Sequence, residues 1–335
     1  MTFSEKVKEA KKLEVQFKRE YANENYEVGS KIEKEFLQLR LQIIDSVNEN
    51  INRFKSIPLS VVRERVNQMK RPVPIETGIK SLDRELVGKD AHKRGDIGGF
   101  PLGNLIQIAG AKGAGKTTIL LKMLSNFSLN QKVSWMNFEM SDMQVIDKID
   151  AFNANENNVL YYTSSRELSE IANEIKYLNA SGVKHFVIDS NMKINVSNAS
   201  SFEKDSKISN VLKELTSVLD INIYMINQMS KENEKNNELY LKGGNDTEYD
   251  SDMILFILKA KLLDANDKPK VDELGAVMFD ENIRFIKCTK NRIFDNRLFL
   301  AKIEKSELFG VEVIREMEYV NDDIPNFDNV DMPRL

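Results

Sequence analysis

A glycine-rich run has the residue types that phosphate binding requires. It reads Gly110-Ala-Lys-Gly-Ala-Gly-Lys116-Thr117. Glycines let backbone N–H groups turn inward around phosphate oxygens, and the N-terminus of a following helix adds partial positive charge. In this pattern Lys116 contacts the β- and γ-phosphates of a nucleotide, and the Thr117 hydroxyl ligates Mg²⁺. We therefore predict ATP and Mg²⁺ as ligands. The expected nucleotide contacts are Gly110, Ala111, Lys112, Gly113, Ala114, Gly115, Lys116, Thr117 and Thr118.

A carboxylate follows an apolar run further along the chain. In His185-Phe-Val-Ile-Asp189 three apolar residues precede the acid. Asp189 is therefore expected at the carboxyl end of a buried strand, where ligands bind in open parallel sheets. The interval after Lys116 leaves room for two further strand-helix units. We predict that Asp189 and Thr117 hold the Mg²⁺; the alternative is an aspartate in an ordinary turn.

Hydrolysis also needs a group that orients or deprotonates the attacking water. Glu139 ends the strand pattern Met136-Asn-Phe-Glu139, and we expect it to face the γ-phosphate from the strand beside the phosphate-binding loop. Gln228 ends another strand pattern, Tyr224-Met-Ile-Asn-Gln228, and its amide would sense the same phosphate. Alternatively, Glu139 caps the next helix and Gln228 is a polar residue at a surface strand end.

These residues lie in a region that alternates short β-rich runs with helical runs. Such alternation is typical of a parallel sheet with crossover helices. We predict an α/β fold: a RecA-like P-loop NTPase core with a mostly parallel sheet flanked by helices. The expected strands are Asn104–Ala109, Lys132–Phe138, Val159–Thr163, His185–Asp189, Asn222–Asn227 and Met253–Leu258, then antiparallel Ile283–Cys288, Arg297–Ile303 and Val311–Arg315. The expected helices begin near Lys116, Ser141, Ser165 and Phe202.

Two segments of different composition flank this core. Residues 1–71 carry apolar side chains at helical spacing, and Pro72 and Pro74 end the pattern. The spaced apolar residues are Phe36, Leu39, Ile43, Ile44, Val47 and Ile51. We predict a small all-helical region over 1–71 for oligomerisation or partner docking, the ATPase core over 72–317, and an acidic mobile tail over 318–335.

Composition narrows the class of protein. The 335 residues carry a net charge of −4, so the overall charge of the protein does not favour DNA binding. A basic strip in a groove is still compatible with this net charge. A single cysteine excludes an internal disulfide, and with only two histidines a structural zinc site is not expected. The sequence shows neither a secretory signal nor an apolar run of about 18 residues. We expect a cytoplasmic protein without membrane contact.

Taken in order, the motifs resemble the RecA-like helicase domain of hexameric replicative helicases, the DnaB, phage primase-helicase and Twinkle family. The resemblance covers residues 75–315. Two of its elements flank loops: Glu76-Thr-Gly-Ile-Lys-Ser-Leu-Asp83 precedes the phosphate-binding loop, and Gly243-Gly-Asn-Asp-Thr-Glu248-Tyr-Asp-Ser-Asp252 follows the DNA-binding loop. Three others imply roles: Phe138-Glu-Met140 contains the catalytic base, Val187-Ile-Asp-Ser-Asn-Met-Lys193 the metal ligand and Ile226-Asn-Gln228 the phosphate sensor. The last element, Lys290-Asn-Arg292, matches the family's Lys-x-Arg.

The Lys-x-Arg resemblance implies that Arg292, with Lys290 beside it, acts on the nucleotide of a neighbouring subunit. An arginine supplied in trans offsets charge on the transferring phosphate and is worth about 10³–10⁵ in rate where such arginines have been studied. The implied assembly is a homo-oligomer, a hexameric ring. The alternative is an arginine in a structural salt bridge.

DNA contact is expected from the loop between Ser230 and Asn245. Its candidate residues are Lys231, Lys235, Lys242, Gly243 and Gly244. Lysines and backbone amides grip phosphates without reading sequence. Three glutamates dilute the basic character, and a mobile surface loop is the alternative. The favoured function is an ATP-driven helicase that translocates on single-stranded DNA.

Two other functions stay open. Lys290-Asn-Arg292-Ile-Phe294 is also similar to an element of RadA-type recombination ATPases, although the zinc-binding cysteines of that family are absent from this sequence. An ATP-switched assembly protein of the KaiC type, without DNA, is the second alternative. The resemblance to helicases does not reach the first 70 residues, so a helicase loader, a primase or another replication protein could dock there.

Overall fold

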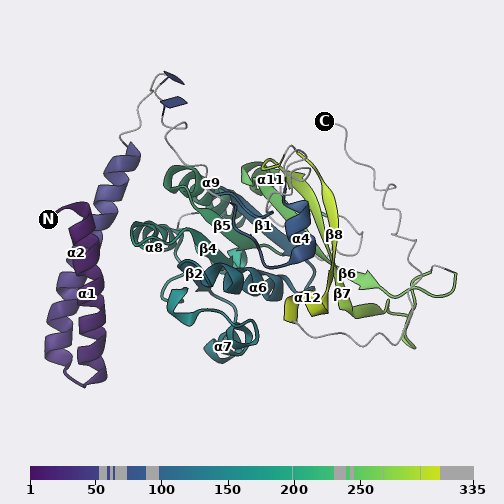
Figure 1. Ribbon diagram of the computed structural model, residues 1–335, viewed down its shortest axis with the longest axis horizontal. Coiled ribbons are helices and arrows are strands. Elements are labelled where there is room, and N and C mark those ends of the chain that lie inside the picture. Colours follow the sequence, from purple (N-terminus) through teal and green to yellow (C-terminus); the bar gives the residue numbers. More distant parts are fainter. Residues whose placement is uncertain are drawn as a thin grey trace.

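The computed structural model describes residues 1–52, 59–60, 63–64, 74–87, 98–197, 199–229, 239–241, 245–266, 268–294 and 296–309. In these ranges an eight-stranded sheet carries helices on both faces, and a helical hairpin lies at the N-terminus (Figure 1). The linker at Pro72, the expected strand Val311–Arg315 and the acidic tail 318–335 lie outside the described residues.

The strand order across the sheet is β3-β2-β4-β5-β1-β6-β7-β8. The strands are β1 (Leu105–Gly110), β2 (Val133–Asn137), β3 (Val159–Tyr162), β4 (His185–Asp189), β5 (Asn222–Ile226), β6 (Met253–Lys261), β7 (Phe279–Asn291) and β8 (Phe299–Glu304). Strands β1 to β6 are parallel, and β7 and β8 are antiparallel. The predicted α/β class is therefore confirmed.

Helices connect the parallel strands: α6 (Lys116–Ser128), α7 (Asp142–Ala151), α8 (Leu168–Ala180), α9 (Ser201–Leu219) and α11 (Asn245–Asp250). The short helix α4 (Lys80–Glu85) precedes β1, and α12 (Lys305–Phe309) follows β8. Ser141 and Ser200 begin α7 and α9 as N-caps, each completing a capping box with the residue three positions on. Among the described helices, none combines the length and the apolar character that crossing a membrane requires.

Apolar side chains alternate between the two faces of the sheet, because successive residues of a strand point to opposite sides. In β1, Ile106 and Ile108 belong to the cluster that includes α6 and α7. Leu105 belongs to the cluster that includes α8 and α9. Covering both faces makes β1, β2, β4 and β5 buried along their whole length. This burial explains their nearly continuous apolar sequences.

The N-terminal hairpin is formed by α1 (Phe3–Ala22) and α2 (Tyr26–Asn52), and it packs against α8. The Phe36 ring meets the Tyr177 ring edge-on, with 6.1 Å between centroids. Arg40 pairs with Glu174 on α8, and the Lys176 ammonium donates to the side-chain oxygen of Asn48 at 2.7 Å. Of the apolar residues singled out in the sequence, Phe36, Ile43, Ile44 and Val47 are buried.

The strand order corrects one expectation. The strand that carries Glu139, β2, does not lie beside β1, because β4 and β5 lie between them. After β1 the chain crosses to the far half of the sheet, and the later strands β4 and β5 fill the gap. The strands β1 and β2, which are consecutive in sequence, are therefore not neighbours in this sheet. The carboxyl ends of all six parallel strands nevertheless meet at one edge of the sheet.

Candidate nucleotide site

The phosphate-binding loop joins β1 to α6, and its glycines allow backbone conformations that other residues rarely adopt. A Cβ on Gly110 would lie 2.5 Å from the Ile257 carbonyl oxygen of the neighbouring strand, which no side chain tolerates. Gly115 has φ +98°, in the left-handed region. It begins α6 without a side-chain cap, so the N–H groups of the first helical turn face the loop interior. Uncapped N–H groups of this kind bind anions.

Lys116 lies inside this loop. Its ammonium donates to the Gly110 carbonyl oxygen at 2.8 Å and to the Ala111 carbonyl oxygen at 2.9 Å. The positive charge is thereby held within the curve of backbone N–H groups. Lys112 and Gly113 form the exposed tip of the loop. The nine residues predicted to contact nucleotide are thus one continuous loop and helix start.

Thr117 and Asp189 are brought together from α6 and β4. The Thr117 hydroxyl donates to Asp189 Oδ2 at 2.9 Å. The other carboxylate oxygen, Oδ1, is buried and has no hydrogen-bond partner among the described residues. Burial raises the pKa of Asp189 to about 6; the Thr117 hydrogen bond opposes this shift, whereas the nearby Glu139 adds to it.

This pair fits Mg²⁺. The ion prefers oxygen ligands and is usually held by one or two protein side chains together with phosphate oxygens. The hydroxyl of Thr117 and the open oxygen of Asp189 are of that kind and lie at the loop. A divalent cation would also offset the cost of burying a carboxylate.

Glu139 lies beside this pair rather than beside the loop strand. In the β2–β4 register Asn137 is opposite Asp189, so Glu139 emerges just beyond the strand end. The Ser190 hydroxyl donates to Glu139 Oε2 at 3.2 Å. The N-cap of α7 is Ser141, so capping does not occupy Glu139. Its carboxylate is exposed at the edge of the sheet from which the phosphate-binding loop starts.

Asn137 braces the turn that carries Glu139. Its side-chain oxygen accepts from the backbone N–H groups of Glu139 at 3.3 Å and Met140 at 3.0 Å. Its side-chain nitrogen donates to the Met140 carbonyl oxygen and to the Tyr161 hydroxyl, both at 2.7 Å. The Tyr161 hydroxyl in turn donates to Asp142 at 2.8 Å. The turn that carries the predicted base is therefore held by a network from three elements.

Gln228 follows β5 at the same edge. Since β5 lies between β4 and β1, Gln228 lies between the Asp189 strand and the phosphate-binding loop. Its backbone N–H donates to the Asn227 side-chain oxygen at 2.8 Å. The Asn227 N–H donates to the Ile108 carbonyl oxygen of β1 at 2.9 Å. A side chain that senses the γ-phosphate would have to lie in such a position, between Asp189 and the phosphate-binding loop.

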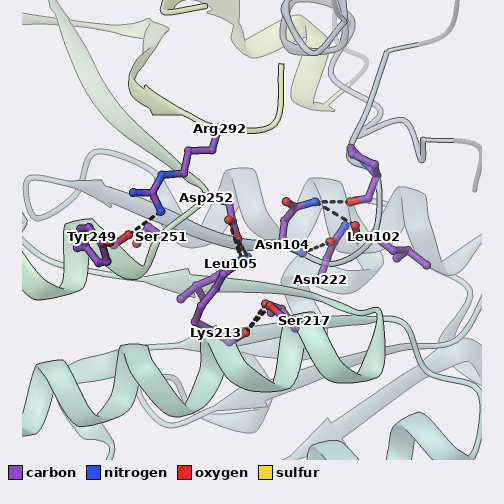
Figure 2. A network of polar contacts seen from close by, with 12 residues as sticks. Leu102, Asn104, Leu105, Lys213, Ser217, Asn222, Tyr249, Ser251, Asp252 and Arg292 are labelled. Atoms are coloured by element: carbon purple, nitrogen blue, oxygen red, sulfur yellow. Dashed lines mark hydrogen bonds and ion pairs between the residues drawn. The ribbon is translucent and has the colours of Figure 1, made fainter. Parts of the chain in front are cut away.

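Arg292 lies at the opposite edge of the sheet. Strand β7 runs antiparallel to β6, and its end at Asn291 pairs with Met253 at the start of β6. The Arg292 N–H donates to the Asp252 carbonyl oxygen at 2.7 Å, and the Asp252 carboxylate accepts from the N–H of Leu105, the first residue of β1, at 2.8 Å (Figure 2). The length of β1, about 16 Å at about 3.3 Å per residue, therefore separates Arg292 from its own phosphate loop.

The comparisons with known proteins agree with this fold. No protein-family model matches the chain. Protein RecA of Borrelia turicatae is 30% identical over 99 residues, which span 28% of this chain and 27% of that protein. The solved ATPase domain of a DnaB-like helicase superposes with a TM-score of 0.56 at 18% identity, covering 76% of this chain and 95% of that one. The structure of a DnaB-like replicative helicase and its interactions with primase gives a TM-score of 0.56 at 18% identity, covering 82% and 75%.

The fold is that of a RecA-like ATPase domain. At this identity the solved structures establish the fold, and the RecA match covers a short part of both chains. The predicted RecA-like core is therefore confirmed. The roles of the individual site residues stay predictions.

The RecA-like domain places two cations at its loop that the sequence did not single out. The Arg284 Nε donates to the Ala114 carbonyl oxygen at 3.2 Å, and Nη1 donates to the carbonyl oxygens of Asp280 and Ile283, each at 2.7 Å. The Lys259 ammonium lies 3.7 Å from the point that a Cβ on Gly113 would occupy. Both residues come from the β6–β7 pair, and no sequence spacing relates that pair to the loop.

The predicted DNA contacts lie outside the described residues. These are Lys231, Lys235, Lys242, Gly243 and Gly244. Met229, just before the loop, and Leu241, within it, belong to one small apolar group with Ile254 and Phe256 of β6. The chain therefore contacts the sheet immediately before the predicted loop and again at Leu241.

Proposed function

We propose that this chain is an ATP-hydrolysing, ring-forming helicase that translocates on single-stranded DNA, with its nucleotide sites between subunits. One observation carries the proposal. The cation predicted to stabilise the transferring phosphate, Arg292, lies one strand length from its own loop, at the far edge of the sheet. A second copy must supply that arginine if hydrolysis uses it.

In this proposal each site residue has one task. The loop from Gly110 to Thr118 binds the phosphates of ATP, and Lys116 leaves its two carbonyl partners to contact the β- and γ-phosphates. Thr117 and Asp189 hold Mg²⁺, which when bound neutralises charge on the phosphate oxygens. Glu139 orients the attacking water and accepts its proton.

The remaining residues link the reaction to assembly and DNA. Gln228 senses the γ-phosphate next to the loop that begins at Ser230. Arg292 and Lys290 of one copy reach the phosphates bound to the next copy. The edge of the sheet that carries the phosphate-binding loop and the edge that carries Arg292 are different surfaces. The contact between copies is therefore head-to-tail, and such contacts close into rings or continue as helical filaments. A hexameric ring, as the sequence resemblance implies, is the proposed state.

The test is complementation between two inactive variants. ATP hydrolysis is measured with and without single-stranded DNA for the wild type, for Glu139→Gln, for Arg292→Ala and for an equimolar mixture of the two variants. We expect each variant to lose at least about 10²-fold in turnover. The mixture should recover part of the activity, because some of its interfaces combine an intact Glu139 with an intact Arg292.

Arg84→Ala, at an exposed position on α4, is the matched control and should hydrolyse ATP at the wild-type rate. Lack of recovery in a mixture that assembles normally would contradict hydrolysis between copies. A rate of ATP hydrolysis that single-stranded DNA does not change would be consistent with an ATPase but would contradict the helicase, and it would favour the KaiC-like alternative.

A recombination ATPase is the second candidate function. The match to Protein RecA over 99 residues favours it, as does the similarity of Lys290-Asn-Arg292 to the RadA element. A forked duplex separates the two candidates. A helicase unwinds it with ATP, whereas a recombination ATPase shows DNA-stimulated hydrolysis without unwinding.

A further inference from the structure

The backbone of Arg292 is held firmly, whereas its side chain extends over the surface. Its N–H donates to the Asp252 carbonyl oxygen. The Asp252 carboxylate is nearly buried and is fixed by the Leu105 N–H and by the Lys213 ammonium, at 2.8 and 2.6 Å from Oδ2 (Figure 2). The starting point of the arginine is therefore part of the rigid sheet. Where its charge points depends on what the side chain contacts.

The Arg292 side chain contacts Tyr249, and so does that of Lys290. The Arg292 guanidinium carbon lies 5.2 Å from the Tyr249 ring centroid, and its Nη1 donates to the Tyr249 carbonyl oxygen at 2.9 Å (Figure 2). The Lys290 ammonium lies 5.9 Å from the same centroid. It donates to the same carbonyl oxygen at 3.0 Å and to that of Glu248. One tyrosine thus contacts both residues of the Lys-x-Arg pair.

The Tyr249 ring is 72% exposed, so it is not a core residue whose packing explains it. It projects from α11, a helix tied to α9 by the Ser209 hydroxyl, which donates to Asp250 at 2.6 Å. Carbonyl oxygens at the C-terminal end of a helix attract cations. The ring and these carbonyl oxygens together hold the charged groups of Lys290 and Arg292 near the end of β7.

We propose that Tyr249 is a positioning residue for the arginine supplied to the neighbouring nucleotide. A free arginine side chain samples many rotamers and loses that freedom when it binds phosphate. An aromatic face that already restricts the guanidinium reduces this loss at the moment of binding. A guanidinium can keep its face on the ring while the N–H groups at its rim bind phosphate, and a cation–π contact at an exposed site changes an equilibrium roughly two- to five-fold.

This inference rests on the proposed function, because it needs Arg292 to act on another copy. The complementation mixture separates the two ideas. In that mixture the Glu139→Gln copy donates the arginine and cannot hydrolyse, and the Arg292→Ala copy hydrolyses and cannot donate. Tyr249 touches Arg292 of its own chain only, so its effect must depend on which copy carries the substitution.

The experiment places Tyr249→Ala in either copy and measures ATP turnover of the mixture. In the donating copy it should lower the recovered activity roughly two- to five-fold. In the hydrolysing copy it should leave the recovered activity unchanged. Tyr249→Phe keeps the ring and should behave as the parent in both copies. Because Tyr249 is exposed, thermal unfolding of each variant should match the parent.

Three outcomes would overturn the inference. They are an equal loss from both copies, no loss from either copy, and a higher turnover with Tyr249→Ala in the donor, which would mean that the ring holds the arginine back. If the parent mixture itself recovers no activity, the proposed function fails first.

Discussion

At the residue scale, the candidate base depends on a neighbour that does no chemistry. Asn137 is 3% exposed, and it holds the Glu139 turn through two backbone N–H groups and one carbonyl. We expect Asn137→Ala to lower the turnover number of ATP hydrolysis about 10-fold, because the carboxylate loses its orientation toward water. Mg·ATP affinity should stay near wild type, since the phosphate loop is untouched.

Steady-state hydrolysis and binding of a fluorescent ATP analogue check this prediction. Asn130→Ala, at an exposed position after α6, serves as control. Tyr161→Phe, which removes one partner of Asn137, should give a smaller loss. The prediction is wrong if affinity falls as much as turnover.

Arg284 carries a second residue-scale prediction. A trans peptide group directs its C=O and N–H to opposite sides. Anchoring the Ala114 carbonyl outward on Arg284 therefore turns the Gly115 N–H toward the loop interior. One hydrogen bond is worth about 0.5–1.5 kcal/mol net, so Arg284→Gln should raise KM for ATP about two- to ten-fold with little change in kcat.

Glu281→Gln is the matched control for Arg284. It removes an exposed ion pair with Arg284, at 3.0 Å, and leaves the contact with Ala114 in place. A drop in kcat without a change in KM would assign Arg284 to the chemical step and contradict a role in shaping the loop.

Residues whose types carry chemistry could be predicted from the sequence, whereas the residues that orient them could not. Lys116, Thr117, Asp189 and Glu139 could be predicted as site residues because a glycine-rich loop pattern and acids at strand ends are typical of nucleotide-binding sites in parallel sheets. Asn137 resembles any turn asparagine. Arg284 meets the loop only because an antiparallel strand returns to it, which no local spacing encodes.

At the element scale, β4 contains a histidine that makes stability depend on pH. His185 packs against the rings of Phe127 and Tyr224, which also contact each other, and burial lowers its pKa to about 3, from an ordinary value near 6.5. Between these values the unfolded chain binds a proton that the folded chain does not. The free energy of unfolding therefore falls as the pH falls below about 6.5, by about 2 kcal/mol between pH 7 and pH 5.

Urea unfolding at pH 7, 6 and 5 measures this slope. His185→Asn should be less stable at every pH, because it loses the ring contacts, but its stability should fall less between pH 7 and pH 5. An equal slope in wild type and variant would assign the acid sensitivity to carboxylates instead.

The elements themselves were largely predictable, and their arrangement was not. Strands buried on both faces are largely apolar, and the starts of α7 and α9 have serine caps, so most strand and helix bounds followed from local sequence. The position of β2 did not, because parallel strands joined by helices need not be adjacent. The docking of α2 on α8 shows the same limit: the apolar stripe was visible, and its partner was not.

At the scale of the whole molecule, the phosphate loop and Arg292 occupy opposite edges of one sheet. In the proposed function, a lone copy therefore binds Mg·ATP with its own loop but cannot bring its own Arg292 to that loop for fast hydrolysis. Binding and turnover should consequently respond differently to dilution. Turnover per chain should rise steeply with protein concentration and reach a plateau once copies assemble, whereas binding of a fluorescent ATP analogue should persist in dilute samples.

Mass photometry alongside hydrolysis over the same dilution series checks this prediction. The midpoint of the activity curve should coincide with the midpoint of assembly, because each active site needs two copies. Arg292→Ala should assemble over the same range and stay slow throughout, since its interfaces form without the cation. Constant turnover per chain at concentrations where only single copies are seen would show that one chain completes its own site. Arg284 and Lys259, which lie at the loop of the same chain, would then be the cations to test.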